Sequence, residues 1–119
     1  MALTMYHNPR CSKSRQTLEI INNAGIEPVI VHYLEKPPAA ETIQGLAEML
    51  GLAVADLLRK GESVFKEAAD IPDLDDDAAL AMWIEAHPIV LERPIVVDTD
   101  AGQAVIGRPP ENVRKLLGQ

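Results

Sequence analysis

The chain has 119 residues, enough for one modest hydrophobic core, so its length argues against a two-domain enzyme. The hydrophobic fraction of 47% and the charged fraction of 24% are ordinary for a globular protein and argue against wholesale disorder. A formal net charge of −7 disfavours nucleic-acid binding, which depends on neutralising phosphates, and an aromatic content of 3% disfavours stacking of unpaired bases.

The first residues lack the basic start and the long apolar run of a secretory signal. No segment approaches the roughly 20 apolar residues that a bilayer crossing requires. The single cysteine, Cys11, cannot form an internal disulfide. We therefore expect a cytoplasmic protein without membrane association, in which the lone thiol is either a buried apolar group or a reactive one. A monomer is the default expectation for a small acidic thiol protein.

The first third of the chain predicts a strand, a helix and a second strand. Residues 3–7 form a short, partly alternating run, and helical spacing begins at about Cys11 and ends at Gly25. The β-branched run at residues 28–33 predicts a buried strand. This order is typical of a parallel βαβ unit.

The remainder of the chain predicts several short helices, a hairpin and a final helix. The helices are expected over residues 41–50, 53–59, 63–69 and 77–86. A strand at 94–98 can pair with residues 103–107 across a four-residue turn, and Pro109-Pro110 begins a helix that ends at residue 117. We predict one α/β domain over residues 1–119, with a mixed sheet of order βαβ … ββα and a helical insertion at about 39–90.

Cys11 lies where the first predicted strand gives way to the first predicted helix. A helix N-terminus presents unpaired N–H groups and a partial positive charge, which both favour a thiolate over a thiol. Arg10, Lys13 and Arg15 add positive charge, and His7 lies four residues upstream. A lone cysteine is commonly a small core residue, but these cationic neighbours favour a reactive thiolate.

The same helix start suits a phosphate-like oxyanion. Such a ligand also needs cationic side chains, and three candidates adjoin structural breaks further along the chain. Arg59 ends a short predicted helix, whereas Arg93 and Arg108 each precede a proline. Each arginine taken singly is typical of a solvated surface, but an Arg-Pro pair before a strand is more specific, because an X-Pro bond can be cis and mark a fixed turn.

The segment Tyr-His-Asn-Pro-Arg-Cys-Ser-Lys-Ser-Arg at residues 6–15 closely resembles the active-site loop of the glutaredoxin-coupled arsenate reductase family. The similarity continues through residues 32–35, 56–60, 92–97 and 107–111, in order along nearly the whole chain. The chain is most similar to the short members of that family. The resemblance implies a thioredoxin-like fold with a helical insertion.

The resemblance also implies roles for residues near the cysteine. Cys11 would be the nucleophile, and His7 and Ser14 would help to hold it as a thiolate. Pro94 would be a cis-proline that faces the cysteine, and Asn8 matches a loop position with a structural role.

The three arginines, by the same resemblance, would hold the oxyanion and its thiol adduct; they are Arg59, Arg93 and Arg108. The implied activity is the reduction of arsenate to arsenite, an oxidoreductase reaction of arsenic detoxification that needs neither a metal nor a bound cofactor. Ser14 occupies the second Cys-x-x-Cys position, so an outside thiol must complete the reaction. The implied reductants are glutathione, as co-substrate, and glutaredoxin, as partner.

Two other functions stay open. A monothiol oxidoreductase could use the same thiolate on glutathionylated proteins or on another oxyanion, although the arginines favour an oxyanion over a peptide. A related branch of the fold contains redox-sensing regulators that bind RNA polymerase. Members of that branch usually carry Cys-x-x-Cys and lack the segment around Arg108, so Ser14 and Arg108 make this alternative the minor one.

Overall fold

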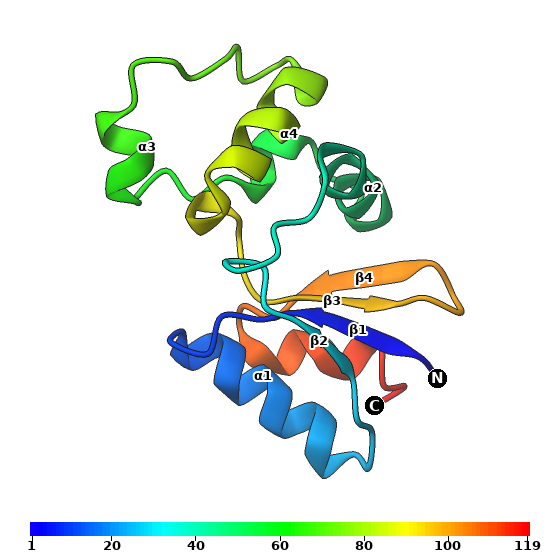
Figure 1. Ribbon diagram of the computed structural model, residues 1–119. Coiled ribbons are helices and arrows are strands. Elements are labelled where there is room, and N and C mark those ends of the chain that lie inside the picture. Colours follow the sequence, from blue (N-terminus) through cyan, green and yellow to red (C-terminus); the bar gives the residue numbers. More distant parts are fainter. The chain divides into compact units, whose positions relative to one another are not determined.

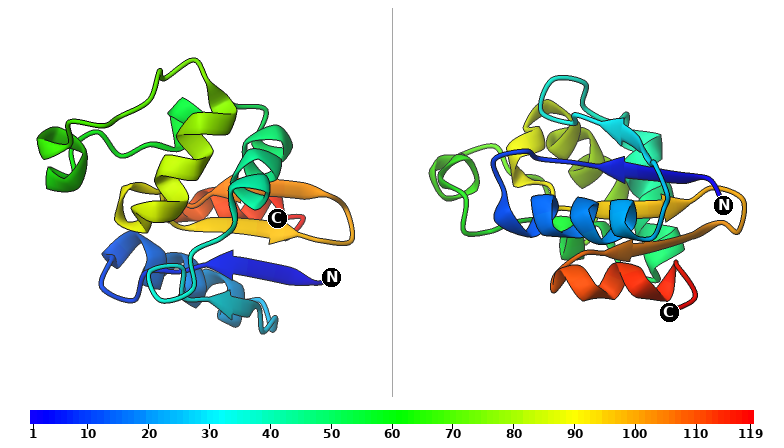
Figure 2. Two further views of the ribbon diagram at one scale, coloured as in Figure 1. Left: turned by 45° about the horizontal axis from the view of Figure 1, so that its top comes forward. Right: turned by 90° about the horizontal axis from the view of Figure 1, so that it is seen from below.

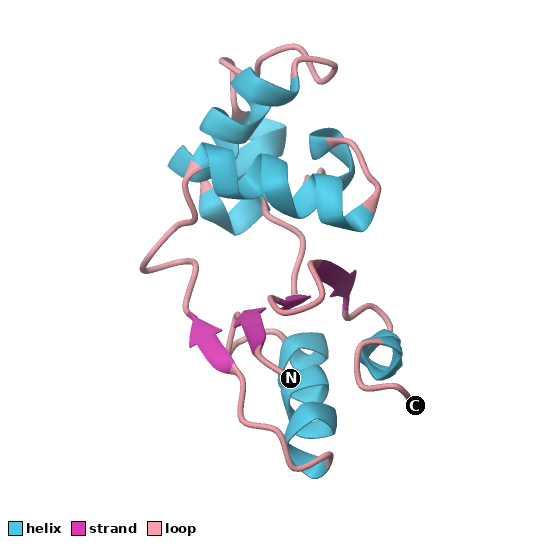
Figure 3. Ribbon diagram, turned by 90° about the vertical axis from the view of Figure 1, so that its right-hand side faces the viewer, coloured by secondary structure: helices cyan, strands magenta, loops and turns pink.

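The computed structural model describes all 119 residues and contains two compact units. One unit combines residues 1–33 with residues 93–119, and the other comprises residues 34–92. The first unit contains every strand, and the second contains helices only (Figure 3). No helix has both the length and the apolar character that a membrane crossing requires.

The strands of the first unit are β1 (Leu3–Tyr6), β2 (Val29–Val31), β3 (Ile95–Asp98) and β4 (Gln103–Ile106). They form one sheet of order β2-β1-β3-β4 (Figure 1). β2 pairs parallel to β1, as expected for strands joined through the intervening helix α1 (Ser12–Asn23), whereas β3 pairs antiparallel to β1 and to β4. The mixed α/β sheet and the C-terminal hairpin confirm the predicted class.

The second strand differs from its prediction. β2 covers three residues rather than residues 28–33, and Val29 is 65% exposed. The physical reason is its place at the edge of the sheet, where a β-branched run gains pairing on one side only. Its composition alone could not distinguish an edge strand from a central one.

A hydrophobic core lies between the sheet and the two helical elements α1 and η3 (Pro110–Lys115), which pack side by side on one face (Figures 1 and 2). Met5, Ile21, Val96 and Val113 are fully buried there. Each such side chain contributes about 1.5–3 kcal/mol through burial. The final helix, which was predicted over residues 109–117, is the shorter 3₁₀ helix η3.

The unit formed by residues 34–92 contains α2 (Ala40–Leu50), η1 (Val54–Leu57), α3 (Ser63–Glu67), α4 (Asp77–Ala86) and η2 (Pro88–Val90). α2 packs on α4, and their apolar faces are buried. α4 has the predicted bounds, because Asp76 accepts a hydrogen bond from the backbone N–H of Ala79 and so caps the first turn.

Candidate active site

Cys11 is the N-cap residue of α1 and is partly buried. Its backbone is extended (φ −91°, ψ 122°), and its carbonyl accepts the first helical hydrogen bond, from the backbone N–H of Arg15 at 3.0 Å. Helices usually begin with Ser, Thr, Asp or Asn at this position, since a side-chain oxygen satisfies the unpaired N–H groups. A sulfur at the N-cap faces the same N–H groups, and they stabilise its thiolate form.

The pKa of the Cys11 thiol is lowered. Burial acts in the opposite direction, but it is outweighed by the backbone N–H groups of Ser14 and Lys13, by a side-chain hydrogen bond from Arg93 and by the charge of Arg108. The sulfur makes no capping hydrogen bond of ordinary geometry, so the two N–H groups act on it as dipoles at the helix start. Cys11 therefore ionises to the thiolate at a lower pH than an ordinary thiol does.

Alkylation of Cys11 by iodoacetamide is expected to proceed at about pH 7, below the usual thiol pKa of about 8.5, because the thiolate is the reacting form. The rate should be measured against pH for the native and for the urea-unfolded protein. Labelling reports one site, since the chain has one cysteine. If the alkylation rate of the native protein rises at the same pH as that of the unfolded protein, the proposed thiolate is contradicted.

His7, Asn8 and Ser14 form a buried hydrogen-bond network beside Cys11 in the chain. The Nδ1 of His7 lies 2.7 Å from the Oγ of Ser14, which also accepts the backbone N–H of Asn8 at 3.1 Å. Asn8 stabilises the turn further, since its Oδ1 accepts the N–H of Arg10 and its carbonyl accepts the N–H of Cys11. The network fixes the loop that carries the sulfur.

The pKa of His7 is lowered, first by burial and then by the charges of His32 and Arg15. The ring of His7 is therefore mainly neutral at neutral pH, and only 5% of the residue is exposed. A neutral ring can accept the Ser14 hydroxyl at Nδ1 or donate to it, according to its tautomer. His7 thus orients the hydroxyl of Ser14, which is wholly buried.

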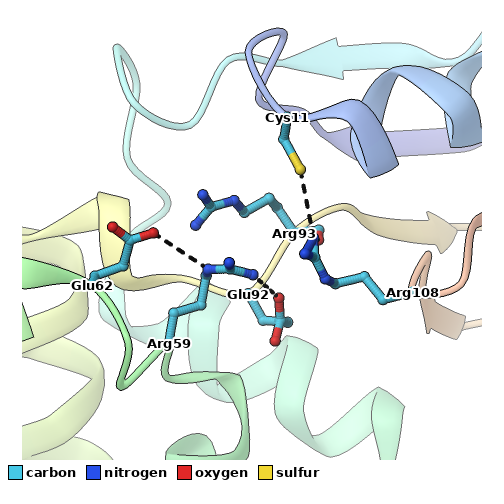
Figure 4. A network of polar contacts seen from close by, with 6 residues as sticks. All are labelled: Cys11, Arg59, Glu62, Glu92, Arg93 and Arg108. Atoms are coloured by element: carbon cyan, nitrogen blue, oxygen red, sulfur yellow. Dashed lines mark hydrogen bonds and ion pairs between the residues drawn. The ribbon is translucent and has the colours of Figure 1, made fainter.

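Within the first unit, Arg108 contacts the Cys11 sulfur (Figure 4), and a side-chain hydrogen bond from Arg93 also lowers the pKa of the thiol. Nη1 of Arg108 lies 3.5 Å from the sulfur and donates to the carbonyl oxygen of Arg93 at 3.2 Å. The Arg93–Pro94 and Arg108–Pro109 peptide bonds are both cis. Two guanidinium groups and a helix start therefore converge on one sulfur, an arrangement that stabilises an anion there.

Tight packing holds the segment that leads to Arg108. The backbone N–H of Gly107 donates to the carbonyl of Pro94 at 2.9 Å, and its carbonyl oxygen lies 3.4 Å from the Thr17 hydroxyl, which also donates to the Lys13 carbonyl at 2.8 Å. A Cβ atom at Gly107 would lie 2.7 Å from Cγ of Pro94 and closer still to Oγ1 of Thr17. Only glycine fits this contact between α1 and the strand β3 that follows Pro94.

Arg59 lies in the helical unit, where two carboxylates hold it (Figure 4). Its Nη1 donates to Oε1 of Glu92 at 2.7 Å, and its Nε lies 3.5 Å from Oε1 of Glu62. Burial opposes its charged form, but the two carboxylates outweigh burial and raise the pKa of Arg59. A short antiparallel contact, Leu58 opposite Leu91, aligns the two segments that carry Arg59 and Glu92.

The two carboxylate partners of Arg59 were not predicted from the sequence. Glu62 follows Arg59 at the i,i+3 spacing typical of helical ion pairs, so the sequence contained a local signal for it. Glu92 is 33 positions from Arg59, and nothing local to either residue predicts the pair. His, Cys, Asp and Glu side chains form no group of three that could hold a metal ion.

Comparison with known proteins connects this site to one family. The family model described as "ArsC family" matches residues 6–116. An "Uncharacterized protein YfgD" from Escherichia coli K12 is 44% identical over 115 residues, which cover 96% of this chain and 95% of that protein. An "Arsenate reductase" from the same organism is 43% identical over 115 residues, which cover 97% of this chain and 80% of the relative.

A solved structure supports the same relationship. The structure titled as an arsenate reductase from Vibrio cholerae superposes with a TM-score of 0.85 at 42% identity, and the match covers 97% of both chains. This agreement confirms the predicted thioredoxin-like α/β fold and the family resemblance drawn from the motifs.

Proposed function

The chain belongs to the ArsC family, and from this premise we propose that it reduces arsenate to arsenite with Cys11 as nucleophile. The observation that carries the proposal is the contact of a lowered-pKa thiol at a helix N-terminus with Arg108 and Arg93. The relatives named arsenate reductase support the substrate. A thiolate beside fixed cations is the combination that attack on an oxyanion requires.

In the first step the Cys11 thiolate forms a bond to As(V) and one arsenate oxygen leaves as hydroxide, which is protonated to water. Arg93 and Arg108 offset the negative charge of the oxyanion as it approaches a second anion, the thiolate. By family resemblance, Arg59 is proposed to contribute a third cation. Arsenic remains As(V) in the resulting thiol adduct.

The second step needs two electrons from outside the chain, because Ser14 stands where a second cysteine would be needed. We propose glutathione as co-substrate and glutaredoxin as partner. Their two thiols become one disulfide, arsenic is reduced from As(V) to As(III), arsenite leaves, and Cys11 returns as a thiolate. The balance is one arsenate and two thiols giving one arsenite, one disulfide and one water. No metal or bound cofactor enters this balance, and a monomer is sufficient.

The direct test is arsenate-dependent oxidation of NADPH in the presence of glutathione, glutaredoxin and glutathione reductase. Turnover is expected for the natural chain, with none after omission of glutathione. A Cys11→Ser variant is the control, since serine keeps the N-cap but is a far weaker nucleophile at neutral pH.

Absence of turnover from a folded protein whose Cys11 still alkylates rapidly would reject arsenate as substrate. The thiolate site would then stand, and glutathionylated proteins or another oxyanion would be tested next. Retention of polymerase subunits by a protein without thiol activity would favour the regulatory alternative.

A further inference from the structure

Asn112 lies in η3, and its side chain bridges two backbone carbonyls of the segment that presents Arg108. Its Nδ2 donates to the carbonyl oxygen of Ile106 at 3.2 Å and to that of Arg108 at 3.1 Å. A side-chain amide has two N–H donors, so each carbonyl can receive one of them. Ile106 is the last residue of β4, and the chain beyond it leaves the sheet.

Side chains hold this segment from two directions. The carbonyls of Ile106 and Arg108 accept from Asn112, and the carbonyl between them, on Gly107, lies 3.4 Å from the Thr17 hydroxyl of α1. Asn112 thus pairs two carbonyls of this segment at a point where regular strand pairing ends. Because backbone carbonyls need a partner when they leave water, these bonds select one conformation of the segment.

The conformation of this segment determines where the Arg108 guanidinium can lie. Its Nη1 contacts both the Cys11 sulfur and the Arg93 carbonyl, at 3.5 and 3.2 Å. An arginine side chain has many rotamers, and its end is placed accurately only if its backbone is fixed. We propose that Asn112 is a positioning residue, which fixes the backbone of Arg108 so that the guanidinium meets the Cys11 sulfur.

Both hydrogen bonds of the Asn112 side chain go to backbone carbonyls, so its effect on the sulfur passes through the Arg108 backbone. Its consequence for turnover rests on the proposed role of Cys11 as nucleophile. Titration of the thiol needs no arsenate, however, so rejection of arsenate as substrate would leave this inference testable.

The test is the pH profile of iodoacetamide alkylation in an Asn112→Leu variant, which keeps the branched shape of the side chain, adds some bulk and removes both donors. Residues that share a hydrogen-bond network are commonly coupled by enough to change an equilibrium about threefold or more. We therefore expect the rate at neutral pH to fall about threefold or more, with the profile moved to higher pH. Asn23→Leu, an identical change at an exposed position, is the matched control and should leave the profile unchanged.

A second measurement distinguishes positioning from general loosening of the fold. In an Arg108→Leu background, Asn112→Leu should produce no further shift, because the group it positions is gone. An unchanged profile in the folded single variant would overturn the proposal, and so would an equal shift in both backgrounds. Asn112→Ala repeats the test without added bulk, and failure of both variants to fold would assign Asn112 to folding instead.

Discussion

An Arg108→Leu variant is expected to lose about 100-fold or more in arsenate-dependent turnover, the effect of removing one donor from a preorganised anion site. Arg108 contacts the Cys11 sulfur at 3.5 Å and its charge lowers the pKa of that thiol. Its loss therefore has two consequences. A smaller fraction of the thiol is ionised at neutral pH, and less positive charge is available when the oxyanion arrives.

The coupled assay and the alkylation profile separate these two consequences. Raising the pH restores the thiolate, so it should recover the alkylation rate but only part of the turnover. Arg108→Lys keeps the positive charge but loses the planar guanidinium group. We therefore expect its turnover to lie between that of the natural chain and that of Arg108→Leu. Arg114→Leu makes the same change at an exposed position and serves as the control. Turnover within threefold of the natural chain in Arg108→Leu would remove Arg108 from the proposed site.

Local patterns in the sequence predicted the elements that are determined locally. The helix at 77–86 has its predicted bounds, since Asp76 caps it and His87-Pro88 follows it. The hairpin of β3 and β4 follows from two short runs around a four-residue turn. Cys11 was predicted at a helix start from the residues around it, and it is the N-cap of α1. In each case the determining groups lie within a few positions of one another.

Features that depend on distant residues were not predictable from these patterns. The edge position of β2 depends on the insertion of β1 between β2 and β3 in the sheet. The pairing of Arg59 with Glu92 and the bonds of Asn112 to the Arg108 segment depend on the folded chain path. The family motif identified the three arginines, but it gave no information about the groups that hold them. The motif thus indicates the residues that are proposed to react, and the structure shows the contacts that hold them.

Replacement of Gly107 by alanine is expected to destabilise the protein by about 1–3 kcal/mol, the usual cost of forcing an extra carbon into a packed interior. The new Cβ would lie 2.7 Å from Cγ of Pro94 and even closer to Oγ1 of Thr17. Both neighbours are buried, and Thr17 is wholly so, which leaves them no space to move into. Relief of the contact would have to displace the segment that carries Arg108, so slower alkylation of Cys11 should accompany the lower melting temperature.

Gly45→Ala is the matched control, because a Cβ atom at Gly45 would meet nothing within 4 Å. Gly45 lies inside α2, where alanine is favoured over glycine by up to about 1 kcal/mol, so this variant should melt at the same or a higher temperature. Thermal unfolding of both variants compares the same added methyl group in closed and in open space. Suppose that Gly107→Ala has the melting temperature of the natural chain and that its Cys11 is alkylated at the same rate. The contact among Gly107, Thr17 and Pro94 then does not constrain the Arg108 segment.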